Sequence, residues 1–169
     1  DQLQALRKFF LINLYKYFIK RFENMHLKKI KTFFFFFFFF QAFNFLNAYE
    51  LKFGQVKIEN FMFKVEIADT KEKRKNGLMF RSSLNIDQGM LFILPESSIA
   101  NVWMKNTELS LDIIFISEEN IIVDLLKEVM PLSEKIYTSK MVAKYILEIN
   151  SGLIDKLGVN IGDEVYIEY

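Results

Sequence analysis

A tryptophan, a lysine and an asparagine stand close together in WMKNT (103–107), which contains the only tryptophan of the chain. An aromatic wall, a cation and an amide are a common way to hold a sugar or a small anion. Strand alternation places Trp103 and Lys105 on one face and Asn106 on the other, so a bend near Asn106 is needed to bring all three together. The alternative interpretation is an edge strand whose lysine is solvated.

Two carboxylates lie in apolar surroundings further along the chain. Asp112 stands between Leu111 and Ile113, and Glu148 lies near the end of an apolar strand. Two carboxylates with shifted pKa values would suit acid/base chemistry. A single inward carboxylate needs a cation or several donors, because an unpaired buried charge is costly. Asp112 is therefore either a general base or ligand-orienting group, or a structural acceptor for turn amides.

An arginine, Arg81, is the last residue of GLMFR (77–81). This motif begins with Gly77, which can end a helix. An arginine in a cleft favours recognition of carboxylate or phosphate groups. The structural alternative is an ion pair with Asp112, Glu148 or Asp87. We predict that Arg81, Lys105 and Asp112 converge on one site, with Trp103 as its wall. The candidate ligand-binding residues are Arg81, Trp103, Lys105, Asn106, Asp112 and Glu148.

Several kinds of catalytic site are excluded by residue content. The chain has no cysteine, and its single histidine is His26, in the part that we assign to the leader. A Ser-His-Asp triad, a Cys-His dyad and a zinc site of the usual kind therefore cannot be built in the body. No Walker loop or dinucleotide fingerprint is present. We expect no cofactor and no metal, although a carboxylate-held divalent cation stays open.

The charge of the 169-residue chain is divided unevenly. Residues 1–49 carry eight Lys/Arg against two acidic residues, a net +6, whereas residues 50–169 carry 14 against 19, a net −5. The acidic body has no basic stripe, which argues against nucleic-acid binding.

The segment from Met25 to Ala48 has the pattern of a secretory signal. Lysines at 28, 29 and 31 precede eight consecutive phenylalanines at 33–40, and Ala48 is the expected last residue removed. The apolar run is shorter than the ~20 residues that span a bilayer. We therefore favour a cleaved signal over an uncleaved anchor, and expect a periplasmic or extracellular protein that contacts membrane only through this leader.

Residues 1–24 begin with aspartate, and RKFFLINLYKYFIKRF (7–22) mixes aromatic and basic residues. They could form an interfacial helix, but we interpret them as an upstream extension. The expected organisation is an extension at 1–24, a signal peptide at 25–48 and a single domain at 49–169.

The body reads as seven or eight short strands with two short helices. Thr70 can cap one helix that Gly77 ends, and Ser151 can cap the other, ended by Gly158. Pro95 is expected to stop a strand. The expected strands are 55–59, 61–69, 89–95, 100–104, 111–117, 121–129, 141–149 and 165–169, and the helices 71–76 and 151–157. This predicts a mainly β (β-rich α+β) fold, a compact, mostly antiparallel, barrel-like domain.

Four segments of the body resemble the domain of unknown function 192 family. They are IADTKEKRKNGLMFR (67–81), GMLF (89–92), WMKNTELSLDIIFI (103–116) and LEINSGLIDKLGVNIGD (147–163). The resemblance covers about residues 62–168. It implies a small β-rich domain, often secreted in bacteria, with no established activity. One departure is Ser110, where the family usually has a proline; a serine keeps the backbone N–H that proline lacks.

Three functions follow as hypotheses. The first is an extracytoplasmic module that binds a small polar ligand, such as a saccharide or small anion. The second is an envelope-polymer hydrolase or lyase that uses Asp112 and Glu148 as a carboxylate pair. The third is a purely structural envelope protein. The sequence leaves open whether the protein is an enzyme, and it leaves the oligomeric state open.

Overall fold

The computed structural model describes residues 51–169, together with Lys16 and Phe37. The chain divides into two units, residues 1–50 and 51–169. The predicted extension (1–24) and signal peptide (25–48) lie outside the described residues. Among the helices that are described, none is long and apolar enough to cross a membrane.

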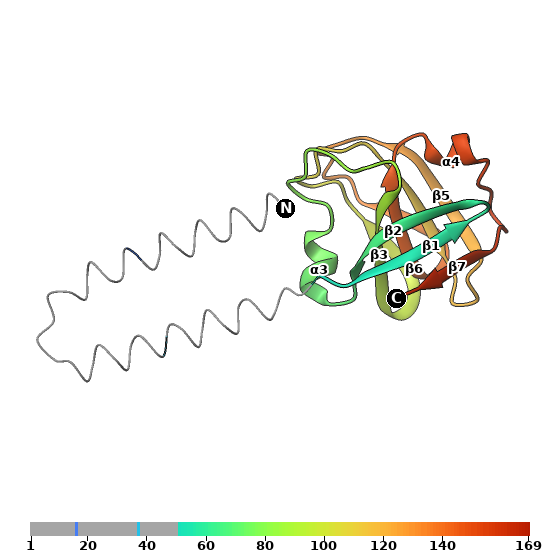
Figure 1. The fold of residues 1–169 in the computed structure, drawn as a ribbon, viewed down its shortest axis with the longest axis horizontal. Helices are drawn as coiled ribbons and strands as arrows, with labels where there is room; N and C mark the ends of the chain where they lie inside the picture. The colour runs from blue at the N-terminus through green and yellow to red at the C-terminus, as the bar shows by residue number, and fades with distance from the viewer. Residues whose placement is uncertain (1–15, 17–36, 38–50) are drawn as a thin grey trace, which may run out of the picture. The chain divides into compact units, whose positions relative to one another are not determined.

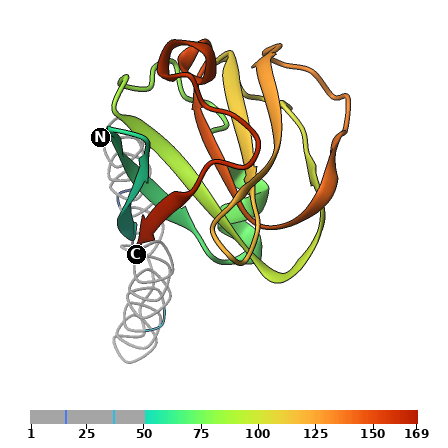
Figure 2. The same cartoon turned by 90° about the vertical axis from the view of Figure 1, so that its right-hand side faces the viewer.

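The second unit is built on one seven-stranded sheet in the order β5-β4-β6-β3-β2-β1-β7. A bridge between Ile121 and Glu164 joins the chain just before β5 to the chain just before β7, so the two edges of the sheet approach each other. Figures 1 and 2 show the resulting curl of the strands. The strands are β1 (Phe53–Ile58), β2 (Phe61–Ala68), β3 (Gln88–Val102), β4 (Leu111–Ile116), β5 (Ile122–Val129), β6 (Tyr137–Asn150) and β7 (Val165–Glu168). The mainly β, barrel-like prediction is confirmed.

The strand pairs are antiparallel with one exception. β2 and β3 run parallel, and the chain between them contains the helix α3 (Lys71–Asn76). A hairpin turn reverses the chain direction and so gives antiparallel strands. Two parallel strands need a longer crossover connection, which returns the chain to the same end of the sheet. The crossover brings the end of α3 beside the sheet, where the candidate site lies.

The third strand differs from its prediction. β3 is one strand to Val102, although we expected Pro95 to end it at residue 95. Its pairing with β6 shifts register between Ile93 and Ser98. A proline is tolerated within a sheet at such an irregularity because no ladder hydrogen bond is needed from its nitrogen. Trp103 therefore lies just after the strand and not inside one.

The two short helices begin in different ways. The Thr70 side chain caps α3 by accepting a hydrogen bond from the Lys73 N–H at 3.2 Å, as predicted. The second helix, α4 (Leu153–Leu157), has no side-chain cap, and Gly152 stands at its start in the left-handed conformation. The predicted cap at Ser151 is therefore wrong. The backbone N–H of Ser151 donates instead to the Ser110 carbonyl at 3.2 Å.

Each face of the sheet carries an apolar core. The first core includes Leu147 and Ile149 of β6 and Ile114 of β4, and α4 packs on it through Leu153. The second core includes Ile146 of β6 and Phe115 of β4, and its outer cover includes Leu78, Met104 and Ala68. Strand alternation sends successive residues of β4 and β6 to opposite cores.

Candidate functional site

A pocket of ≈ 100 Å³ lies in the second core, where the chain after α3 faces β3 and β6. Its apolar wall comes from Leu78, Met79, Phe92, Leu94, Val102 and Ile146. Its polar and aromatic lining comes from Arg74, Lys75, Asn76, Asn101, Trp103, Thr107 and Glu148. Gly77 also lines the pocket. An apolar pocket with a few convergent polar groups is the usual form of a small-molecule site.

Glu148 is the only acidic residue of the pocket lining. It is 6% exposed, and it pairs across the sheet with Met90 and Ile113, which places its side chain on the face of the second core. Its carboxyl makes no hydrogen bond or ion pair with any other described residue. Burial raises its pKa to about 8, because the apolar surroundings disfavour the charged form. The carboxyl is therefore protonated at neutral pH.

Trp103 forms part of the pocket wall and is 41% exposed. The Lys105 ammonium lies 5.6 Å from the centre of its ring, within the range of a cation–π contact. Lys105 also reaches the Glu134 carboxylate at 3.5 Å. The lysine thus orients the ring from outside, because it is absent from the pocket lining.

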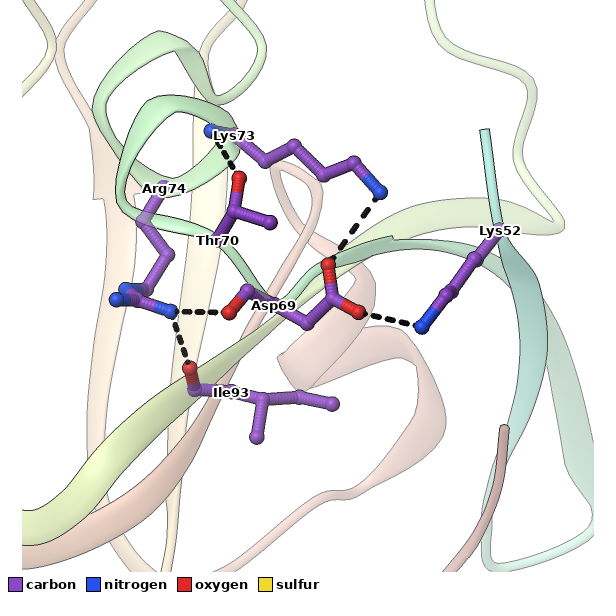
Figure 3. Close-up of polar contacts among 6 residues, drawn as sticks. All are labelled: Lys52, Asp69, Thr70, Lys73, Arg74 and Ile93. Atoms are coloured by element: carbon purple, nitrogen blue, oxygen red, sulfur yellow. Dashed lines mark hydrogen bonds and ion pairs between the residues drawn. The ribbon is translucent and has the colours of Figure 1, made fainter. Parts of the chain in front are cut away.

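The start of α3 is fixed to the sheet by a polar cluster, shown in Figure 3. The Arg74 Nη1 donates to the backbone carbonyls of Asp69 and Ile93 at 2.7 and 2.9 Å. The Asp69 carboxylate accepts from Lys52 at 2.8 Å and from Lys73 at 3.3 Å. The hydrogen bond from Lys52, followed by the contacts with Lys73, lowers the pKa of Asp69. These contacts hold the pocket's helical wall against β2 and β3.

The pocket residues of α3 were not among the predicted site residues. Arg74, Lys75 and Asn76 immediately precede Gly77, which has φ +47° and sits 3.2 Å, measured from the position of an added Cβ, from the Phe92 ring. The glycine allows the end of the helix to lie close to the sheet. The only sequence signal was the run of cations before this glycine, which reads equally well as a solvated helix face.

Asp112 does not belong to the pocket. It is fully buried and its two oxygens accept from the backbone N–H groups of Glu128 and Ile154, each at 2.8 Å. It pairs with Ile149, so its side chain lies on the face of the first core. The structural interpretation of Asp112 is therefore correct. The structure does not bring Asp112 and Glu148 together as an acid/base pair, because the sheet separates the two carboxyl groups.

The predicted convergence of Arg81, Lys105 and Asp112 is also not formed. Arg81 makes a two-pronged ion pair with Glu66, an acid that we did not consider as its partner. Asn106 turns the chain with φ +55°, which supplies the expected bend, but its carbonyl accepts from the Phe80 N–H at 2.8 Å. Of the six predicted residues, the pocket brings together Trp103 and Glu148.

A metal centre has no support in the part of the chain that is described. Within it, no group of three or more His, Cys, Asp or Glu side chains could hold an ion. The chemistry available in the pocket is therefore that of a neutral carboxyl, two cations, amides and an aromatic face.

The sequence of this domain matches the model of a known protein family. The family model DUF192, described as uncharacterized ACR, matches residues 54–167. The chain belongs to the DUF192 family. This match confirms the resemblance seen in the sequence motifs.

Relatives of this DUF192 chain include archaeal proteins named only UPF0127 protein. One from Thermococcus sibiricus is 39% identical over 104 residues, 60% of this chain and 64% of the relative. One from Pyrococcus abyssi is 38% identical, over 60% of this chain and 84% of the relative. The chain thus spans less than two thirds of the first of these relatives.

Two solved structures are similar to the DUF192 domain. A protein of unknown function from Novosphingobium aromaticivorans superposes with a TM-score of 0.64 at 31% identity, covering 69% of this chain and 84% of the other. A Sinorhizobium meliloti protein named a "putative transcription regulator" gives 0.65 at 34% identity, covering 70% and 95%.

Ser110, the departure from the DUF192 motif, has a local role. Its hydroxyl donates to the Val129 carbonyl at 3.3 Å, and its own carbonyl accepts from Ser151. The turn into β4 is thus tied to β5 by a contact that a proline side chain could not make.

Proposed function

We propose that this domain is a binding module that holds a small polar ligand, such as one sugar unit that is partly enclosed, at the pocket between α3, β3 and β6. The observation that carries the proposal is the Glu148 carboxyl, which is buried, lines the pocket and has no partner among the described residues. Among the described residues, no side-chain oxygen is both fully enclosed and without a hydrogen-bond partner, so the Glu148 oxygens reach the space of the pocket. Polar groups in such a place are nearly always hydrogen-bonded, and a ligand hydroxyl would be a suitable partner.

The lining of the pocket supports a ligand that is only partly enclosed. At ≈ 100 Å³ the pocket is smaller than the cavity of about 150 Å³ that holds benzene, so it can take part of a sugar ring while the rest lies beside the half-exposed Trp103. Trp103 lines the pocket and would supply an aromatic surface for the C–H groups of a ring, as aromatic side chains do in small-molecule sites. Asn101 and Thr107 add hydrogen-bonding groups to the same lining.

The proposal includes action outside the cytoplasm. The lysines before the phenylalanine run and Ala48 after it support export by a cleaved signal. We do not extend a role in transcription from the Sinorhizobium protein to this chain, because residues 50–169 carry a net charge of −5. A phosphate backbone is bound by basic surfaces.

The single tryptophan makes the test direct, since Trp103 fluorescence reports on this pocket alone. Glucose, N-acetylglucosamine and glucuronate should be titrated against the protein and against Glu148→Leu. We expect saturable quenching or enhancement with at least one sugar, and about a tenfold loss of affinity in the variant, the effect of losing one buried hydrogen bond.

The control variant is Glu72→Gln, an exposed position of α3 outside the pocket lining, and it should bind like the parent. If no sugar changes the fluorescence or the amide NMR spectrum of the folded protein, the binding proposal fails and the purely structural role takes its place. Equal affinity for the parent and for Glu148→Leu would remove Glu148 from the site.

A further inference from the structure

We infer that the ligand of this pocket is acidic: a small hydroxylated ring with one carboxylate or phosphate group, the anionic group lying at the end of α3 and a hydroxyl lying at Glu148. This inference rests on the proposed function and names the chemistry of its ligand. Uronic acids and sugar phosphates share this chemistry.

The charge of the lining is the first argument. Arg74 and Lys75 both line the pocket, and Glu148 is the one acid there. Neither cation makes an ion pair with Glu148. The nearby Asp69 carboxylate is already shared by Lys52 and Lys73. The two lining cations therefore have no acidic partner among the residues that the structure describes.

The hydrogen-bonding capacity of these cations is the second argument. Arg74 uses Nη1 for the carbonyls of Asp69 and Ile93 (Figure 3), which leaves the donors on Nη2 and Nε uncommitted to any described residue. A guanidinium fixed by two carbonyls is already oriented, so little entropy is lost when it receives an anion. The Lys75 ammonium group likewise makes no hydrogen bond or ion pair within residues 51–169.

The position of the carboxyl is the third argument. Glu148 comes from β6, whereas both cations come from α3, so the pocket has a cationic wall and a separate carboxyl. The raised pKa of Glu148 keeps this carboxyl neutral near pH 7, so that it does not repel an anionic ligand. Its O–H then donates to, and its carbonyl oxygen accepts from, the ligand's hydroxyl groups.

The helix dipole favours cations in the last turn of α3 whether or not they bind a ligand. The test therefore compares a lysine that lines the pocket with another lysine of the same helix. Lys75 lines the pocket, and Lys71 is also exposed but does not line it. Lys75→Gln and Lys71→Gln should each be titrated with glucuronate, glucose 6-phosphate and glucose, using Trp103 fluorescence. Arg74 is left intact because it also holds the sheet.

We expect the parent to prefer an acidic sugar over glucose. Lys75→Gln should lose about three- to fivefold in affinity for the acidic sugar, as for an exposed ion pair, and less than that for glucose, and Lys71→Gln should match the parent. Raising the NaCl concentration from 0.15 to 1 M should lower the affinity for the acidic sugar and leave the affinity for glucose unchanged. A stronger response to glucose 6-phosphate than to glucuronate would identify a phosphate ligand, and the reverse a carboxylate.

Two failures are distinguishable. If glucose binds as tightly as the acidic sugars and Lys75→Gln changes nothing, the acidic-ligand inference is overturned while the binding function stands. If no sugar binds to the folded protein, both are overturned.

Discussion

Asp112 and Glu148 lie on opposite faces of one sheet, although β4 and β6 are neighbours. Asp112 pairs with Ile149, and Glu148 pairs with Ile113, so the two carboxyl groups are one residue out of phase. Because side chains alternate along a strand, this offset sends them to different cores. Asp112 is satisfied by two backbone amides, and Glu148 has no described partner. The first therefore contributes to stability and the second to the pocket.

Asp112→Asn is predicted to destabilise the fold without changing ligand affinity. The N–H groups of Glu128 and Ile154 donate to different oxygens of the carboxylate, and in asparagine one of these oxygens is replaced by an NH2 group that cannot accept. The other N–H is left buried without a partner. We expect a loss of about 2–3 kcal/mol in the free energy of unfolding, measured by urea denaturation.

The matched control is Asp155→Asn, which removes an exposed ion pair with Lys127. It should change the free energy of unfolding by less than about 0.5 kcal/mol. Equal losses in the two variants would mean that the Asp112 hydrogen bonds contribute nothing specific.

The stability of the protein is predicted to fall as the pH rises from about 4.5 to about 8. In the unfolded chain Glu148 loses its proton near the ordinary value of 4.5, and in the folded chain only near 8. Between these values the folded state binds the extra proton, so deprotonation favours unfolding. Below the window both states are protonated, and above it neither is, so Glu148 adds no further slope there.

Glu148→Gln should remove this dependence, because glutamine does not titrate. We expect the variant to exceed the parent by roughly 3–5 kcal/mol in unfolding free energy at pH 8, and by little at pH 4.5. Urea denaturation at several pH values measures the difference. Glu72→Gln should keep the parent's slope. A Glu148→Gln variant that also keeps it would show that the carboxyl is not buried in solution.

The alternation of apolar residues was enough to predict most strands and the fold class, and the capping residues and helix-ending glycines predicted the two short helices. It located Trp103 and Glu148 as well, because each is a polar or amphipathic residue inside an apolar run. It could not predict that Asp112 and Glu148 face opposite cores, because this depends on the register between β4 and β6. Register is a tertiary property that a single strand does not encode.

The α3 side of the pocket was missed for a different reason. Arg74 and Lys75 lie in a run of charged residues, KEKRKN, whose composition is that of any solvated helix face. Only the crossover between β2 and β3 brings this helix against the sheet. The partner of Arg81 was missed for the same reason, since Glu66 lies on β2 and 15 positions away in sequence.

The ion pair between Arg81 and Glu66 is predicted to support the fold and not the ligand. Its side chains are 29% and 18% exposed, and two guanidinium nitrogens meet two carboxylate oxygens. A double-mutant cycle with Arg81→Lys and Glu66→Gln should give a coupling of about 1 kcal/mol, because lysine cannot reproduce the two-pronged contact.

The same cycle on Lys127 and Asp155, a more exposed pair, should give a coupling near zero. Titration of Arg81→Lys by Trp103 fluorescence should give the parent's affinity. A large loss of binding with unchanged stability would return Arg81 to the list of ligand-binding residues.

Gly77→Ala is predicted to damage both the stability and the pocket. Gly77 has φ +47°, which a residue with a Cβ adopts only at a cost of about 1–3 kcal/mol. The new methyl group would also lie 3.2 Å from the Phe92 ring, tighter than ordinary contact, so the ring or the end of α3 must move. Gly158→Ala separates the two effects, because Gly158 has φ +71° but nothing within 4 Å of an added Cβ.

Gly158→Ala should therefore cost about 1–2 kcal/mol in unfolding free energy and leave ligand affinity unchanged. Gly77→Ala should cost more and should also weaken binding, since both Gly77 and Phe92 line the pocket. Urea denaturation and Trp103 fluorescence titration of the two variants, side by side, measure both quantities. If the two variants lose the same stability and neither loses affinity, backbone strain alone accounts for the result. The close approach of α3 to Phe92 then does not shape the pocket.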